Sequence, residues 1–445
     1  MKMKFKILLI FFAGFCFKHN YTFAQTNIFS PTNNLNQSVA KLIHPILVNR
    51  LYELNTNNLI WFLSGEQSHL LRNALKNKID SSVNIGLQKN KYHYTDLVES
   101  LDKNFFPQDS IAAMQLDRIF TDAAIAYCKD VYQGYNIDHW ISYDEISKKY
   151  EDADNTFLLK ILTQIKSANG LNDFINSLEP KTNEYLLLKT ALQYKPDTLS
   201  SLKKQQLATS LNFYRWVHHF NFQKYIVVNI ASATLQYFEY DTLKLSMKVL
   251  VGKPFTKTPR FAAYTNQVIL YPYWNVPASI ALKELLPKIK RNPHYIEDLN
   301  MALINSSGNI VDHNNLNWKN YNSSNFPFRL RQSTGCDNSL GVIKFNLTSP
   351  LGVYLHDTNN KGAFLSSMRY LSHGCIRLEK PIELANFLLI KKIDNKFLEA
   401  CMKNQVPVPI NLAKQVPVFV IYQMAETDSR DAVKYYKDIY GLASK

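Results

Sequence analysis

Three residues near the C-terminal end of the sequence could together carry out covalent chemistry. Cys375 stands in YLSHGCIRLEKP (residues 370–381), directly after His373 and Gly374. A second histidine, His356, lies 19 positions upstream in VYLHDT. A cysteine in this setting fits four kinds of site: a nucleophile, a zinc ligand, half of a disulfide, or a buried structural thiol.

Three of these interpretations account for the pattern only in part. His356, His373 and Cys375 are legitimate zinc ligands, with Cys336 as a fourth, but the sequence has no CxxC or HxxxH pair, so we expect no metal. A disulfide through Cys375 would leave both histidines unexplained. A buried structural thiol would explain neither the histidines nor Gly374.

The interpretation as a nucleophile uses every residue of the pattern. Acyl transfer needs a thiolate, a base that removes its proton, and donors for the oxyanion that forms at the attacked carbonyl. We expect His356 to reach Cys375 from a neighbouring strand as that base. Gly374 would let consecutive N–H groups converge on one oxygen, and a helix directly after the motif would add positive potential there.

The segments that must position these residues fall into two halves. Residues from about 26 to 215 show the three- and four-residue apolar spacing of helices. In TDAAIAYCKDVYQG, Thr121 is a plausible N-cap, Gly134 a plausible stop and Cys128 a core residue. From about 223 the alternation is that of short strands, and residues 381–392 predict a helix with Pro381 in its first turn.

Composition limits the classes of function. A chain of 445 residues predicts two or three domains, and 46% hydrophobic residues suffice for packed cores. The net charge of +15 favours an anionic partner, but no basic run with interleaved aromatics occurs, so we expect no nucleic-acid binding. Five cysteines are too few for a disulfide scaffold, and their pairing cannot be read from spacing.

The N-terminus has the pattern of an export signal. MKMKFK is a basic region, ILLIFFAGFCF is an apolar run too short to span a bilayer, and Thr22 and Ala24 fit a cleavage site before Gln25. We therefore predict an exported, periplasmic protein without a transmembrane segment after cleavage. An uncleaved anchor is the alternative.

At the level of motifs, the chain resembles the exported bacterial L,D-transpeptidases with a YkuD-type catalytic domain. SHGCIRLE and YLHDT resemble the family's signature, and TPRF, PYWNVPASI, KELLPK, RLRQSTGCDNSLGVIKF and VPVFVIYQ resemble its other landmarks in order. Upstream, LIWFLSG and LEPKTNEYLLLKTAL resemble the helical scaffold of its large members. The small peptidoglycan-binding module often found in such members has no counterpart around residues 190–220.

The resemblance implies an α+β multidomain protein with five segments. These are a signal peptide (1–24), a helical scaffold domain (25–215), a β-rich, β-sandwich-like catalytic domain (223–425), a lid insertion within it (283–325) and a C-terminal tail (426–445).

It also implies roles for individual residues. Cys375 would be the nucleophile and His356 the general acid/base, with Asp357 or a backbone carbonyl orienting the imidazole. The remaining positions would support the oxyanion region or contact substrate: His373, Gly374, Ser372, Arg377, Tyr354 and Trp274.

The expected function is therefore the formation of 3→3 cross-links between peptidoglycan stem peptides, without a cofactor and with carbapenem-type β-lactams as inhibitors. Water, a D-amino acid or a wall protein could replace the acceptor amine, which would make the enzyme an L,D-carboxypeptidase, an exchange enzyme or a protein-attachment enzyme. The rival hypotheses are a non-catalytic peptidoglycan-binding scaffold protein and a cysteine peptidase that cleaves L,L bonds. A redox interplay between Cys336 and Cys375 is a further hypothesis.

Overall fold

The structure is a computed structural model that describes residues 41–101, 107, 109–194, 198–428 and 430–442. The predicted signal peptide, and with it Cys16, lies outside these residues. None of the described helices is long and apolar enough to cross a membrane. Within the described ranges, no group of three His, Cys, Asp or Glu residues could hold a metal ion.

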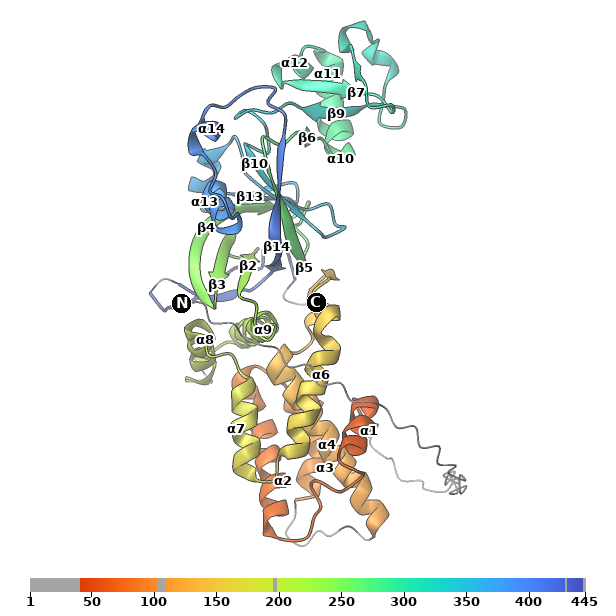
Figure 1. Ribbon diagram of the computed structural model, residues 1–445, viewed down its shortest axis with the longest axis vertical. Helices are drawn as coiled ribbons and strands as arrows, with labels where there is room; N and C mark the ends of the chain where they lie inside the picture. The colour runs from red at the N-terminus through yellow and green to blue at the C-terminus, as the bar shows by residue number, and fades with distance from the viewer. Residues whose placement is uncertain (1–40, 102–106, 108, 195–197, 429, 443–445) are drawn as a thin grey trace, which may run out of the picture. The chain divides into compact units, whose positions relative to one another are not determined.

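Helices make up the first half of the described chain, as the apolar spacing predicts (Figure 1). They are α1 (Pro45–Leu54), α2 (Glu66–Asp80), α3 (Tyr94–Glu99), α4 (Ser110–Gln133), α5 (Ile137–Trp140), α6 (Ser147–Gln164), α7 (Ala168–Leu178), α8 (Asn183–Gln193) and α9 (Ser201–His218). The middle of helix α4 is buried continuously from Ile119 to Cys128, and Cys128 lies fully inside its packed face.

The predicted start of helix α4 is wrong and its predicted end is confirmed. Asp109 caps the N-terminus by accepting a hydrogen bond from the Ala112 N–H (2.8 Å), well before the predicted Thr121. Thr121 lies in the helix interior, where its hydroxyl accepts a buried hydrogen bond from the Trp61 indole (2.9 Å). Gly134 ends the helix with φ +80°, where a Cβ would clash with the Asn212 carbonyl oxygen.

The second half is built on one large sheet. Its strands are β1 (Tyr143–Asp144), β2 (Lys224–Asn229), β3 (Thr234–Glu239), β4 (Thr242–Gly252), β5 (Phe261–Leu270), β10 (Ile343–Leu347), β11 (Leu355–His356), β12 (Tyr370–Ser372), β13 (Ile376–Leu378) and β14 (Val408–Ile421). The order is β1-β5-β10-β11-β13-β4-β3-β2-β14, and β14 also pairs with β5. The sheet therefore closes on itself as a barrel, which corrects the expected β-sandwich-like form of this domain, while the expected α+β layout holds.

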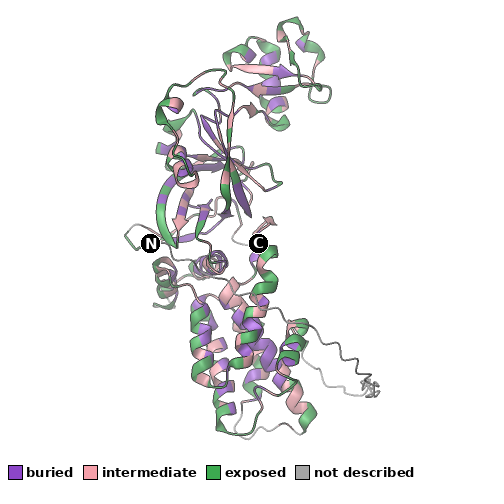
Figure 2. Cartoon of the chain, in the orientation of Figure 1, coloured by how far each residue is buried: buried purple, intermediate pink, exposed green. Residues whose placement is uncertain are grey.

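Alternation along these strands separates a core from an outer face. Ile343, Phe345, Leu355, Ile376 and Leu378 point into one hydrophobic core inside the barrel. Because successive side chains of a strand point to opposite faces, the residues between them point outward. Buried positions run along the barrel strands in Figure 2.

A smaller subdomain, which we call the cap (residues 274–332), is inserted between β5 and β10. Its sheet has the order β6-β9-β7-β8, formed by β6 (Trp274–Asn275), β9 (Arg329–Gln332), β7 (Met301–Ile304) and β8 (Ile310–Val311). Its helices are α10 (Ala278–Ile280), α11 (Leu286–Arg291) and α12 (Tyr295–Asp298), with a π-helical turn at Ala281–Leu285. The cap has its own hydrophobic core. The predicted lid segment, residues 283–325, lies within the bounds of the cap.

Two parts of the chain outside the barrel pack onto it. β1 pairs in parallel with β5, and Phe213, Trp216 and Val217 of α9 share a hydrophobic cluster with Phe419 of β14 and neighbouring barrel residues. Near the C-terminus, β15 (Ala425–Thr427) and β16 (Val433–Tyr435) form a hairpin.

A strand separates the cysteine motif from the helix predicted directly after it. β13 (Ile376–Leu378) follows Cys375, and helix α13 (Pro381–Leu388) begins only after it, with Pro381 in its first turn as predicted. The helix ends at Leu388, short of the predicted residue 392, and a further helix, α14, spans Asn395–Glu399. The helix therefore does not follow Cys375 directly, as the sequence had suggested.

Candidate active site

A tight turn presents Cys375 at the start of β13. Gly374 has φ +121°, a conformation that side chains with a Cβ rarely adopt. The buried Ser372 hydroxyl donates a hydrogen bond to the Cys375 carbonyl oxygen (2.6 Å) and accepts one from the Gly374 N–H (3.1 Å). From the loop after β4, Thr258 donates to the Gly374 carbonyl oxygen (2.8 Å). These bonds fix the backbone on both sides of the sulfur.

Strand register brings His356 and Cys375 to the same face of the barrel. β11 and β13 are adjacent parallel strands in which His356 lies opposite Arg377. Cys375 precedes Arg377 by two residues and so shares its outward direction. His356, Cys375 and Arg377 all line one cleft with a volume of about 450 Å³.

The imidazole of His356 is held in one orientation. It is buried, and its Nδ1 lies 2.5 Å from the Asp357 carbonyl oxygen, so Nδ1–H donates and Nε2 keeps a free lone pair. The carboxylate of Asp357 points elsewhere, accepting from the Val342 N–H (3.0 Å) and pairing with Lys361. Of the two orienting groups predicted, the backbone carbonyl makes the contact.

Burial also keeps His356 uncharged. Desolvation, followed by repulsion from Arg377, lowers the pKa of His356 to about 3, against the opposing effect of the Asp357 carbonyl. Lys344 acts in the same direction as Arg377 but more weakly. A neutral imidazole with a free Nε2 can accept a proton throughout the neutral pH range.

Cys375 is a free, half-buried thiol that contacts Tyr354. Burial raises the pKa of the Cys375 thiol above its usual value, while hydrogen bonds from the Tyr354 backbone and hydroxyl, together with the charges of Lys344 and Arg377, act in the opposite direction. The resting sulfur is therefore protonated near neutral pH. The Cys375 N–H has no hydrogen-bond acceptor among the described residues, whereas the Gly374 N–H is occupied by Ser372. Of these two consecutive N–H groups, that of Cys375 is open to an oxyanion.

The remaining predicted substrate residues also line the cleft. The Tyr354 ring lies 5.5 Å from the His356 ring, measured between centroids, and Tyr354 hydrogen bonds to Trp274 at the edge of the cap. The Arg377 guanidinium is half-buried, and its Nε has no hydrogen-bond partner in the described structure. An unpaired buried donor of this kind favours an anionic ligand in the cleft.

The side chain of His373 contacts the cap. Its Nε2 lies 2.9 Å from the Glu284 carboxylate, which projects from the π-helical turn of the cap. Both side chains are partly exposed and line the cleft. The pair is a direct contact between the cap and the turn that carries Cys375.

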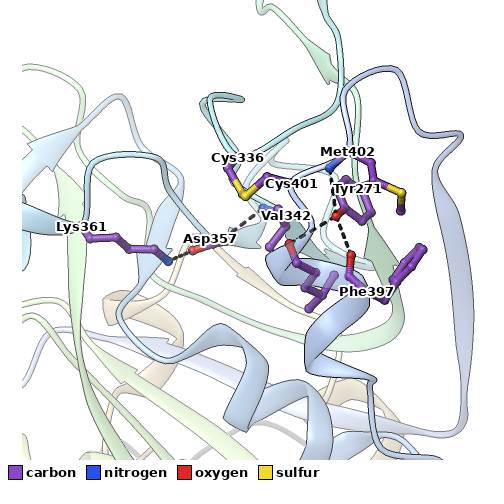
Figure 3. The surroundings of a disulfide bond; sticks show 9 residues. Tyr271, Cys336, Val342, Asp357, Lys361, Phe397, Cys401 and Met402 are labelled. Atoms are coloured by element: carbon purple, nitrogen blue, oxygen red, sulfur yellow. Dashed lines mark hydrogen bonds and ion pairs between the residues drawn. A yellow bond between two sulfur atoms is a disulfide. The ribbon is translucent and has the colours of Figure 1, made fainter.

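A disulfide joins the base of the cap to the barrel. Cys336, just after β9, is bonded to Cys401, just after α14, so the hypothesis of a redox interplay between Cys336 and Cys375 loses its free partner. In Figure 3 the Tyr271 hydroxyl lies beside this link and donates to the Phe397 carbonyl oxygen (2.6 Å). Among the described cysteines, Cys128 and Cys375 remain free.

Sequence reasoning missed two charged residues at this site, Glu284 and Lys344. Lys344 lies opposite His356 on β10, and its ammonium sits 4.3 Å from the centroid of the Tyr354 ring. The alternation in LGVIKFNLT marks Lys344 only as outward-facing, so no signal in the sequence could have tied it to Cys375. Glu284 lies in KELLPK, which the resemblance included only as a landmark.

Comparison with known proteins gives matches for both halves of the chain. Residues 223–410 match the family model of the L,D-transpeptidase catalytic domain (YkuD), and residues 47–192 match a model described as a scaffold domain. A curated protein of Haemophilus influenzae, provisionally named an L,D-transpeptidase, is 33% identical over 307 residues. The match covers 68% of this chain and 61% of that relative's length.

Solved structures of the same kind are similar at low identity. An L,D-transpeptidase in complex with imipenem is 14% identical with a TM-score of 0.21, covering 45% of this chain and 59% of the other. The enzyme from Mycobacterium smegmatis is 15% identical with a TM-score of 0.20, covering 44% and 58%. A variant of the Enterococcus faecium enzyme is 12% identical with a TM-score of 0.21, covering 48% and 62%.

Proposed function

Since the chain carries a catalytic domain of the L,D-transpeptidase family, we propose that it exchanges acyl groups between peptidoglycan stem peptides through Cys375. The thiolate attacks the carbonyl of the third residue of a tetrapeptide stem and forms a tetrahedral intermediate. The C–N bond breaks, D-alanine leaves with a proton from His356, and a thioester remains. The side-chain amine of an acceptor stem then attacks the thioester and loses a proton to His356, which releases the thiolate and forms a 3→3 cross-link.

The observation that carries this proposal is the shared outward face of His356 and Cys375 on adjacent parallel strands of one cleft. The Asp357 carbonyl leaves Nε2 as the only lone pair of the imidazole that can take a proton. Because the pKa of the thiol is raised and that of His356 is lowered, proton transfer is uphill in the resting site. We propose that substrate binding, which excludes water and brings in the carbonyl, favours the transfer.

The turn around Cys375 supports oxyanion stabilisation. The open N–H of Cys375 lies next to the sulfur that attacks, so it can donate to the oxygen of the tetrahedral intermediate. Ser372 and Gly374 would act by holding this N–H in place through the hydrogen bonds described above.

The walls of the cleft support binding of a peptide with a carboxylate. The Arg377 guanidinium, which lines the cleft, would hold the terminal carboxylate of the donor stem, with Tyr354 and Trp274 as apolar walls. Carbapenem-type β-lactams present a strained amide carbonyl beside a carboxylate, so we propose that they acylate Cys375.

Export is part of the proposal. Disulfides persist in oxidising compartments such as the periplasm, and the bond between Cys336 and Cys401 supports that location. The surplus of Lys and Arg suits a wall that carries carboxylates.

The test is the intact mass of the protein after incubation with a carbapenem. We expect one covalent adduct that disappears in Cys375→Ala, persists in Cys128→Ala, and forms at least about a hundredfold more slowly in His356→Ala. Muropeptide analysis of tetrapeptide substrates then identifies the product: a 3→3 dimer, or a tripeptide if water is the acceptor. Absence of an adduct together with retained binding to wall sacculi would favour the non-catalytic scaffold protein.

A further inference from the structure

Lys344 lies in a row of three side chains that crosses the sheet beneath Cys375. On β10 it is paired with His356 of β11, which is paired in turn with Arg377 of β13. The neighbours of Lys344 in its own strand, Ile343 and Phe345, point into the barrel core, so Lys344 points outward with His356. A cation therefore flanks the imidazole on each side.

The ammonium of Lys344 is half-buried and lacks a carboxylate partner among the described residues. Its one described contact is the Tyr354 ring, whose centroid lies 4.3 Å from Nζ. Burial without a counter-ion lowers the pKa of Lys344, and the charge of a Cys375 thiolate would oppose that shift. An uncompensated cation in this position is costly unless an anion forms nearby during the reaction.

Tyr354 connects Lys344 with the sulfur. One side of the ring faces the ammonium, while the hydroxyl and backbone of the same residue hydrogen bond to Cys375. Lys344 does not line the cleft, so it acts behind the first layer of residues that a substrate would touch.

We propose that Lys344 is a positioning residue that favours the anionic form of the Cys375 sulfur by holding a positive charge behind Tyr354. This inference deepens the proposed function and rests on it only in taking Cys375 as the reactive group. The charge of Lys344 also disfavours a protonated His356, so Lys344 affects turnover in two opposing ways: it favours the thiolate of Cys375 and disfavours the imidazolium of His356. Ionisation of the thiol reports only the effect on Cys375, because His356 is neutral in the pH range where the thiol titrates.

Other charged groups near the sulfur are either paired or on the opposite side of His356. Arg377 is the second cation of the row, and its Nε has no hydrogen-bond partner among the described residues. Lys257 lines the cleft but donates to the Tyr440 carbonyl oxygen (2.5 Å), and His373 is paired with Glu284. Removal of Lys344 therefore takes away one of two uncompensated positive charges in this row.

The experiment measures alkylation of the full mature chain by iodoacetamide between pH 6 and 10. Alkylation forms an S–C bond and releases iodide, and it needs no peptidoglycan. Cys128 is fully buried, and Cys336 and Cys401 are paired, so the rate reports on Cys375. We expect Lys344→Met to shift the pH profile upward and to lower the rate at pH 8 about three- to tenfold, as expected for one partly solvated charge at this range.

Three further variants serve as controls. Lys344→Arg should stay within about twofold of the wild type because the charge is kept. Lys248→Met removes an exposed lysine of β4 and should leave the profile unchanged, which excludes an effect of net charge. If Lys344→Met does not fold, Lys344→Gln replaces it and should give the same shift.

Superimposable profiles of a folded Lys344→Met or Lys344→Gln variant and the wild type would overturn the inference. Equal losses in Lys344→Met and Lys344→Arg would also overturn it, because they would assign a packing role to the side chain. A shifted profile without any carbapenem adduct would support the inference while the proposed function fails. A carbapenem adduct with an unshifted profile would overturn the inference while the proposed function stands.

Discussion

The hydroxyl of Ser372 offers a quantitative test of how the turn around Cys375 is held. Ser372 is 1% exposed and bonds both to the Gly374 N–H and to the Cys375 carbonyl oxygen. Ser372→Ala removes both bonds, and the buried Gly374 N–H then has no acceptor. Each unsatisfied buried group costs about 1–3 kcal/mol, and Cys375 is half-buried, so we expect the free energy of unfolding to fall by about 2–4 kcal/mol.

The same substitution should slow acylation. The Ser372 carbonyl oxygen still accepts hydrogen bonds from the Lys253 N–H (3.0 Å) and the Thr256 hydroxyl (3.1 Å), so the strand remains while the turn loosens. A displacement of the sulfur and its N–H by a fraction of an ångström should slow carbapenem adduct formation about ten- to a hundredfold.

Urea unfolding and intact-mass kinetics of Ser372→Ala measure the two effects. The matched control is Ser366→Ala, because Ser366 makes a similar pair of bonds, to the Met368 N–H and carbonyl oxygen, in an exposed turn. We expect that control to lose at most about 0.5 kcal/mol and no reactivity. If Ser372→Ala behaves like Ser366→Ala, the hydroxyl does not hold the turn and the reasoning is wrong.

Three further predictions concern acid stability, the disulfide and the cap. The pKa of His356 is about 3 in the folded protein and about 6.5 in the unfolded chain. Between these values the unfolded chain binds the additional proton, so the free energy of unfolding is unaffected by titration of His356 above pH 6.5 and falls by up to about 1.4 kcal/mol per pH unit as the pH drops toward 3. Urea unfolding of His356→Gln should show a shallower decline between pH 6.5 and 4.5, and an equal slope would contradict the buried neutral imidazole. Double replacement of Cys336 and Cys401 by Ser should cost about 4 kcal/mol because the bond closes a loop with a sequence separation of 65, and dithiothreitol should then have no further effect. Glu284→Gln should change the unfolding free energy by less than about 1 kcal/mol, since its pair with His373 is partly exposed, yet increase hydrogen exchange in residues 278–291; unchanged exchange would show that this pair does not hold the cap.

The split into a helical and a β-rich half could be predicted because it depends on local spacing. The three- and four-residue steps around Cys128 and the alternation from residue 223 onward are properties of short windows, and the structure confirms both. Closure of the sheet could not be predicted, since it depends on β14 pairing with both β2 and β5, far apart in the sequence. The three-residue strand β13 is too short to leave a periodic signal.

The candidate site could likewise be predicted where residue types and local spacing carry the signal, and not where contacts depend on the fold. Cys375, His356 and Gly374 are recognisable because their types and spacing carry the chemistry. The pairing of Cys336 with Cys401 and the place of Lys344 beside Tyr354 depend on the folded register, which no spacing encodes. The motif alone suggests an oxyanion role for His373, whereas its acidic partner, Glu284, comes from the cap.

The way α9 and β1 pack on the barrel affects how the protein can be divided for study. A recombinant fragment starting at residue 223 would lose β1 from the edge of β5 and would uncover Phe419 and Ala262, which α9 now shields. That bare apolar surface and unpaired strand edge would promote aggregation of the isolated fragment. Excision of the β-rich half should therefore begin before Ile137, so that β1 and α9 are retained.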